Sequence, residues 1–174
     1  MNHFDVFGLT PSLDVDLRAL EQKLRTLSLE FHPDRVATSG EPKERRVALE
    51  KTTALNDAFK VLKDPTRRAF YVLKLKGVDL ENEASAAQTK MPMAFLEEVM
   101  ERREQLEAAR ARGDLAGAQA MAAEVATLKT QAFEAATTAL KADDIATAAH
   151  QLGRVKYFTR FLEEVEAFEE ERLS

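Results

Sequence analysis

Apolar side chains recur at intervals of three and four residues along nearly the whole of this chain. Strict alternation of apolar and polar residues, the pattern of a half-buried β-strand, forms no convincing run in its 174 residues. The clearest stripe lies on one face of the first long helix, with charged residues off it, and consists of Leu17, Leu20, Leu24, Leu27 and Phe31. This spacing predicts an all-α protein in which each helix buries one face.

Helix start and stop signals predict an antiparallel hairpin in the first part of the chain. Asp14 or Asp16 can cap the first long helix, and Pro33 ends it because proline disfavours helical geometry in the residue before it. Pro42 is tolerated in the first turn of the partner helix. Asp64-Pro65 ends that helix and begins a shorter one. Together with a short apolar turn near the N-terminus, these elements form a predicted domain of residues 1–76.

The rest of the chain is predicted to be a linker followed by a three-helix bundle. Residues 77–90 have little apolar content, which is typical of a linker. Residues 91–174 contain three long helical patterns, separated by Gly113-Asp114 and by Asp143-Asp144. Because the connections are short, neighbouring helices are expected to be antiparallel.

Composition excludes several classes of function. The chain has no cysteine, so its own side chains can form no disulfide, thiolate metal site or iron–sulfur ligation. It shows no secretory signal and no apolar run of membrane-spanning length, so we expect a cytoplasmic protein without membrane contact. The formal charge is +3 over residues 1–76 and −8 over residues 77–174. No block of Lys and Arg with interleaved aromatic residues indicates nucleic-acid binding.

Three unusual residues stand at the end of the first long helix, in the sequence EFHPDRVATSG. His32, Pro33 and Asp34 suit neither a core nor an ordinary helix end. One explanation is structural, because a cation is favoured near a helix C-terminus, proline stops the helix and aspartate hydrogen-bonds the turn. The other explanation is that this turn contacts a partner protein, and the surrounding pattern favours it.

That pattern resembles a J domain, the co-chaperone module that activates DnaK-like heat-shock ATPases. A leucine stripe ending in an aromatic residue precedes the tripeptide, and ALNDAFKVLKDPTRRA follows at a suitable distance. The resemblance implies that the His-Pro-Asp loop contacts the chaperone and that basic residues steer the encounter. Glu21 and Glu30 stand where general J domains often carry Lys or Arg, which suits a specialised chaperone. The implied chaperone-binding residues are His32, Pro33, Asp34, Lys23, Arg25 and Arg35.

Three further stretches are similar to the HscB family, the J-type co-chaperones of iron–sulfur cluster assembly. They are NHFDVFGL at the start, PTRRAFYVLKLKG after the hairpin and MAFLEEVMERREQLE after the linker. The resemblance spans nearly the whole chain and implies that the bundle binds the scaffold protein IscU and presents it to the chaperone HscA. Eukaryotic relatives often carry an N-terminal metal-binding CxxC region, so this cysteine-free chain is expected to be bacterial, without metal or cofactor.

The first bundle helix has more apolar residues than one buried stripe requires. Its core-facing stripe is best drawn through Phe95, Val99, Arg102 or Arg103, Leu106 and Ala109. Leu96 and Met100 lie beside that stripe, four residues apart, with glutamates around them. Apolar side chains ringed by carboxylates fit a docking patch for a partner with a basic rim. The pattern fits a wide core stripe with a solvated acidic edge equally well.

The HscB resemblance favours the docking patch. It places scaffold-binding residues at Leu96, Met100, Glu101 and Glu104, and one more at Tyr157 in the last helix. Glu97 and Ala108 depart from the family pattern at two matching positions. Tyr157 can also stand at the margin of a core, because its helix has more apolar residues than one stripe needs. The implied scaffold-binding residues are Leu96, Glu97, Met100, Glu101, Glu104 and Tyr157.

Two other functions remain open from the sequence. The bundle could deliver an unrelated client to a DnaK-like chaperone, which makes the chain a J-domain adaptor. His32 and Asp34 could instead act as an acid–base pair in a small hydrolase. No serine or cysteine nucleophile and no glycine-rich phosphate loop accompanies them, so we expect no catalytic residues.

Overall fold

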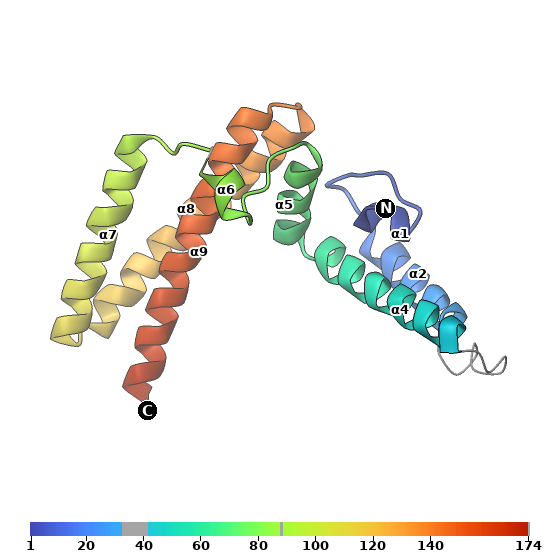
Figure 1. The fold of residues 1–174 in the computed structure, drawn as a ribbon. Coiled ribbons are helices and arrows are strands. Elements are labelled where there is room, and N and C mark those ends of the chain that lie inside the picture. The colour runs from blue at the N-terminus through green and yellow to red at the C-terminus, as the bar shows by residue number, and fades with distance from the viewer. Residues whose placement is uncertain (33–41, 88, 174) are drawn as a thin grey trace. The chain divides into compact units, whose positions relative to one another are not determined.

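The elements of this chain are helices, as the apolar spacing predicts (Figure 1). The structure is a computed structural model, and it describes residues 1–32, 42–87 and 89–173. No β-strand occurs within these ranges. The helices are α1 His3–Val6, α2 Leu17–Glu30, α4 Pro42–Lys63, α5 Pro65–Leu75, α6 Glu83–Ala86, α7 Met93–Arg112, α8 Leu115–Lys141 and α9 Ile145–Leu173.

The chain divides into two compact units, Met1–Val72 and Leu73–Ser174. The sequence places the end of the first domain at residue 76, and that boundary stays a prediction. Residues 77–90, expected to be a linker, contain the short helix α6 and bury Leu80. The Lys156 ammonium of α9 donates a hydrogen bond of 2.6 Å to the Leu80 carbonyl oxygen. This segment therefore packs within the C-terminal unit.

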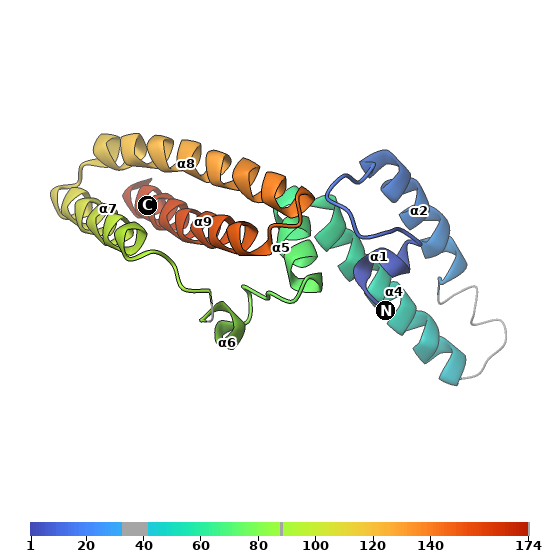
Figure 2. The same ribbon diagram turned by 90° about the horizontal axis from the view of Figure 1, so that it is seen from above.

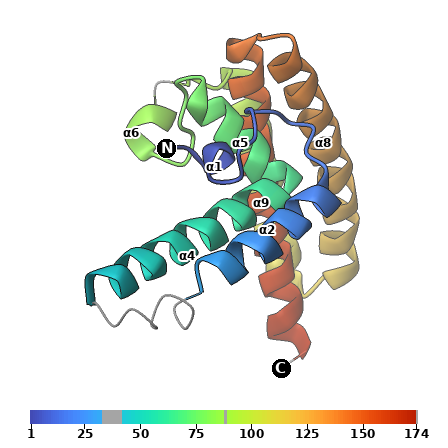
Figure 3. The ribbon, with the colours of Figure 1, turned by 90° about the vertical axis from the view of Figure 1, so that its right-hand side faces the viewer.

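The N-terminal unit is built on the α2–α4 hairpin (Figure 3). Asp16 caps α2, since its Oδ1 atom accepts hydrogen bonds from the backbone N–H groups of Arg18 and Ala19. The short helix α1 packs on α4 and contributes a buried phenylalanine. The core of this unit consists of Phe4, Phe7, Leu20, Ala48, Leu55, Ala58, Leu62, Ala69 and Val72. Of the predicted α2 stripe, Leu20 is fully buried, whereas Leu17 is 44% exposed.

One charged residue of this unit, Arg68 on α5, is buried. Its Nε atom donates to the Leu13 carbonyl oxygen at 2.8 Å, and its Nη1 atom donates to the Leu62 carbonyl oxygen. Burial lowers the pKa of the guanidinium, and the nearby carboxylates of Asp14 and Asp64 partly oppose this shift. The side chain therefore ties the segment before α2 to the C-terminal end of α4.

Replacing this arginine is expected to destabilise the protein. Arg68→Met keeps much of the side-chain length but leaves two carbonyl oxygens without their charged donor. Since hydrogen bonds to charged groups contribute about 1.5–3 kcal/mol each and two are lost, we expect a loss of roughly 3–6 kcal/mol in the free energy of unfolding. Urea unfolding followed by circular dichroism measures it. The control Arg67→Met changes an exposed neighbour and should lose under about 0.5 kcal/mol; equal losses in both variants would contradict the assigned role.

The C-terminal unit contains a three-helix bundle (Figure 2). Gly113 ends α7 in the left-handed region at φ 66°, and Asp114 caps α8 through a 2.8 Å hydrogen bond from the Gly117 N–H group. Both signals were predicted from the sequence and are confirmed. The helix α8 runs antiparallel to its two neighbours, so α7 and α9 run in the same direction.

The core of the bundle pairs small side chains on α8 with large ones on α9. Four of the six buried residues of α8 are alanines, which lets α9 approach closely, and aromatic and branched residues of α9 fill the space. The large buried side chains of α9 are Leu152, Val155, Phe158, Phe161, Val165 and Phe168. Only Phe95, Leu106 and Ala109 are fully buried on α7. This helix therefore adds a narrow stripe to the core and leaves much of its surface exposed.

Candidate functional site

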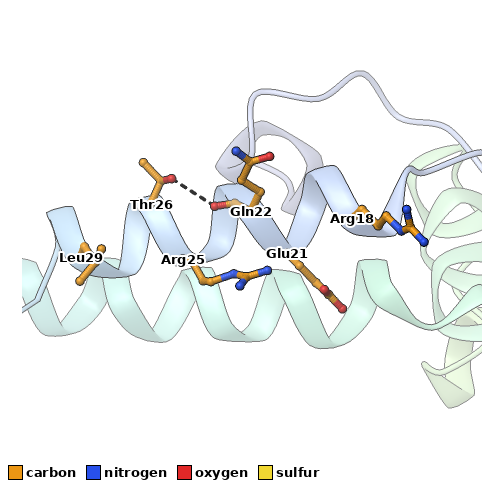
Figure 4. A pocket seen from close by; sticks show the side chains of 6 residues that line it. All are labelled: Arg18, Glu21, Gln22, Arg25, Thr26 and Leu29. Carbon is orange, nitrogen blue, oxygen red and sulfur yellow. Dashed lines mark hydrogen bonds between the residues drawn. The ribbon is translucent and has the colours of Figure 1, made fainter.

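The first candidate surface lies on the exposed side of α2 (Figure 4). A shallow hollow of about 550 Å³ follows this side over three turns. The hydroxyl of Thr26 donates to the carbonyl oxygen of Gln22 at 3.1 Å, so this threonine bonds within its own helix. The hollow is lined by Arg18, Glu21, Gln22, Arg25, Thr26 and Leu29. Two guanidinium groups on one exposed helix face can bind a partner with acidic groups.

The structure does not bring the two predicted basic residues of α2 together. Lys23 and Arg25 are two positions apart, and such side chains leave a helix on different sides. The Lys23 ammonium donates to the Phe7 carbonyl oxygen at 2.8 Å and so connects α2 to the turn after α1. Arg25 instead shares its face with Arg18. Arg18 was not selected from the sequence, although its spacing of seven residues from Arg25 places both on one side.

The predicted chaperone loop is only partly described. His32 follows Phe31, the C-cap residue of α2, and is exposed. Pro33, Asp34 and Arg35 lie outside the described residues, so their roles stay predictions.

The second candidate surface, called the docking face below, consists of Leu96, Glu97, Met100, Glu101 and Glu104 on α7 and Tyr157 on α9. Its apolar residues lie outside the narrow buried stripe of α7. Met100 is 63% exposed and Leu96 is half-buried. A wide core stripe would have buried both side chains. Single exposed apolar residues are common on protein surfaces, but two of them one helical turn apart beside an exposed tyrosine fit an interaction site.

Tyr157 joins the docking face from α9. Its ring packs edge-on against Phe95, with ring centroids 5.6 Å apart, while 37% of the residue stays exposed. Phe95 also packs edge-on against Phe158, which is buried. Tyr157 therefore stands both at the margin of the core and at the edge of the docking face. Leu96 and Tyr157 line one common hollow.

Carboxylates surround the apolar part of the docking face. Glu97, Glu101 and Glu104 are exposed, and Glu101 accepts a 3.3 Å hydrogen bond from Gln105 one turn away. Arg103 is paired with Glu164 of α9, and the hydrogen bond from that pair raises the pKa of the Arg103 guanidinium. The acidic edge therefore suits a partner with a basic rim.

These surfaces can bind partners. Within the described ranges, no group of three or more histidine, cysteine, aspartate or glutamate side chains is arranged so that it could hold a metal ion. In the same part of the chain, no helix has the length and apolar content to cross a membrane.

Sequence reasoning did not select two basic residues beside the docking face. Lys156 and Arg160 are four positions apart on α9 and flank Tyr157. The hollow that Leu96 and Tyr157 share is lined by both of them and by Leu80. Val78 and Leu80, two apolar residues in a mostly polar stretch, were the available signal that residues 77–90 pack against the bundle.

Comparisons with known families match two separate parts of the chain. Residues 2–71 match the DnaJ domain, and residues 91–166 match the family described as the HSCB C-terminal oligomerisation domain. The co-chaperone protein HscB homolog of Vibrio cholerae is 34% identical over 174 residues, covering 99% of each chain. The homolog of Aeromonas salmonicida is 37% identical over 171 residues, covering 98% of this chain and 97% of the relative.

Solved structures show the same fold. The chaperone HscB from Vibrio cholerae superposes with a TM-score of 0.77 at 31% identity, covering 98% of this chain and 99% of the other. Human co-chaperone HscB gives a TM-score of 0.79 at 26% identity, covering 96% of this chain and 81% of the human one. The chain therefore belongs to the HscB family, whose members are J-domain co-chaperones and not enzymes.

Proposed function

We propose that this protein binds an IscU-type iron–sulfur cluster scaffold protein on its docking face and delivers it to an HscA-type chaperone ATPase. The His-Pro-Asp loop and the exposed side of α2 contact the chaperone and stimulate its ATP hydrolysis. The chaperone performs that hydrolysis, and this chain needs no cofactor. The proposed setting is the bacterial cytoplasm, in keeping with the bacterial relatives.

The exposure of Met100 is the observation that supports this proposal most directly. An unbranched, polarisable side chain that is 63% exposed and surrounded by carboxylates suits a protein-binding surface. A J domain in the same chain acts on a DnaK-type chaperone. Joining two binding surfaces in one molecule raises the effective concentration of the scaffold protein at the chaperone.

Steady-state ATP hydrolysis by a purified HscA-type chaperone tests the proposal. The rate is measured with this protein alone, with the scaffold protein alone and with both together. We expect stimulation by this protein alone and a larger, more than additive stimulation when the scaffold protein is present. An equal rate with and without scaffold protein would contradict delivery of this client and favour an adaptor for a different one.

Charge reversal on the acidic edge is expected to slow association with the scaffold protein. The double variant Glu101→Lys, Glu104→Lys replaces attraction by repulsion toward a basic rim. We expect the association rate constant to fall by about tenfold at low salt and to lose its salt dependence, since steering acts mainly on this rate. Stopped-flow binding at several salt concentrations measures it. The control Glu124→Lys, Glu134→Lys makes the same charge change on exposed positions of α8 and should leave the rate nearly unchanged.

A further inference from the structure

A hollow of about 410 Å³ adjoins the docking face within the C-terminal unit. It lies between the segment that contains α6, the first turn of α7 and the middle of α9, and Leu96 and Tyr157 line it. The docking face therefore continues into this hollow without a break. Binding pockets for small groups in proteins span about 300–1,000 Å³, so the hollow can receive side chains of a partner.

The floor of the hollow is apolar. Leu80 is buried, and Met91 lies against Gly153 of α9. A Cβ atom added at Gly153 would stand 2.8 Å from the Met91 sulfur, which is too close for a normal contact. The absence of a side chain at Gly153 therefore leaves room for the Met91 thioether.

The charge beside the hollow is opposite to the charge of the docking face on α7. Lys156 and Arg160 line the hollow, and Glu83 is the one carboxylate among its lining residues, which leaves a balance of one positive charge. The Lys156 ammonium donates a hydrogen bond of 2.6 Å to the Leu80 carbonyl oxygen. Among the described residues, no ion pair is formed by Arg160, whose side chain is exposed.

We propose that this hollow receives an apolar side chain of the scaffold protein that has a carboxylate next to it, and that Arg160 binds the carboxylate. The inference rests on the proposed function, because it extends the docking face of the same partner. Its support is the continuity through Leu96 and Tyr157 and the positive charge at the rim. An apolar floor takes the side chain out of water, and a guanidinium binds a carboxylate through two parallel hydrogen bonds.

The arrangement gives the bound scaffold protein a defined orientation. Its basic rim lies over Glu101 and Glu104, and its acidic residue lies over Arg160. A scaffold protein bound in the reverse orientation would place like charges together. Repulsion between like charges disfavours the incorrect orientation. This effect on specificity is larger than the affinity that the correctly paired charges add.

Two variants of the hollow test the proposal by calorimetric titration with the purified IscU-type scaffold protein. Arg160→Glu reverses the charge at the rim and should weaken binding by about tenfold. Gly153→Ala pushes the Met91 side chain into the hollow and should weaken binding by about fivefold, while the thermal midpoint does not fall because alanine favours the helix. The control Lys129→Glu makes the same charge reversal on α8, outside the hollow, and should bind as the wild type does.

The outcomes separate this inference from the proposed function. Weaker binding by both hollow variants, with normal binding by Lys129→Glu, supports the hollow as part of the scaffold surface. If both hollow variants bind with wild-type affinity while the double variant Leu96→Ala, Met100→Ala binds weakly, the hollow is not part of the scaffold-binding surface. The docking face is then retained. No binding of the scaffold protein by the wild-type chain overturns both.

Discussion

The double variant Leu96→Ala, Met100→Ala is expected to lose most of its affinity for the scaffold protein while it keeps its stability. Truncating a central apolar residue of an interface costs about 2 kcal/mol or more, and each 1.4 kcal/mol is a factor of ten. We therefore expect the dissociation constant to rise by at least about 100-fold. Isothermal titration calorimetry measures it, and the thermal midpoint is recorded on the same samples.

Stability separates a docking face from a core stripe. Because Met100 is 63% exposed and Leu96 is half-buried, the double variant should lose only about 1 kcal/mol of unfolding free energy. Leu106→Ala removes a fully buried leucine from the same helix and should lose about 2–5 kcal/mol. Val47→Ala, Leu49→Ala truncates two exposed apolar residues of α4 and should leave scaffold binding unchanged. Unchanged binding by the Leu96, Met100 variant would contradict the docking face.

His32→Gln is expected to abolish stimulation of the chaperone ATPase. The substitution keeps a polar side chain of similar length but removes the imidazole from the residue that begins the His-Pro-Asp tripeptide. His32 is exposed, so we expect a thermal midpoint within about 2 °C of the wild type. Steady-state ATPase rates and thermal unfolding on the same preparations measure both effects.

A matched substitution checks that the effect belongs to this position. His150 is an exposed histidine on α9, so His150→Gln makes the same chemical change in the other unit. It should stimulate the chaperone as the wild type does. A fall of many degrees in the thermal midpoint of His32→Gln would instead assign this histidine a structural role at the end of α2.

Local sequence signals were sufficient to predict most of the helices. The boundaries at Asp16, Gly113 and Asp114 follow from capping chemistry that acts within four residues. The buried stripe of α7 through Phe95, Leu106 and Ala109 follows from helical periodicity, and the structure confirms these three positions.

Features that depend on contacts between distant segments could not be predicted in this way. The exposure of Met100 depends on how much of α7 is covered by α8 and α9, which periodicity does not give. Leu80 stands in a mostly polar stretch, and its carbonyl oxygen accepts a hydrogen bond from Lys156, which follows 76 positions later. Arg68 likewise bonds to a carbonyl group 55 positions before it. The hollow beside the docking face depends on such long-range contacts.

A mixing experiment is the most direct test of the claim that one molecule must bind both partners. His32→Gln retains the docking face, and Leu96→Ala, Met100→Ala retains the chaperone loop, so the mixture contains both functions on separate chains. With the scaffold protein present, we predict that the mixture fails to reach the ATPase rate of the wild type, because the two surfaces are no longer joined. A mixture that restores the full wild-type rate would contradict the account, since delivery would then require no physical connection between the two surfaces.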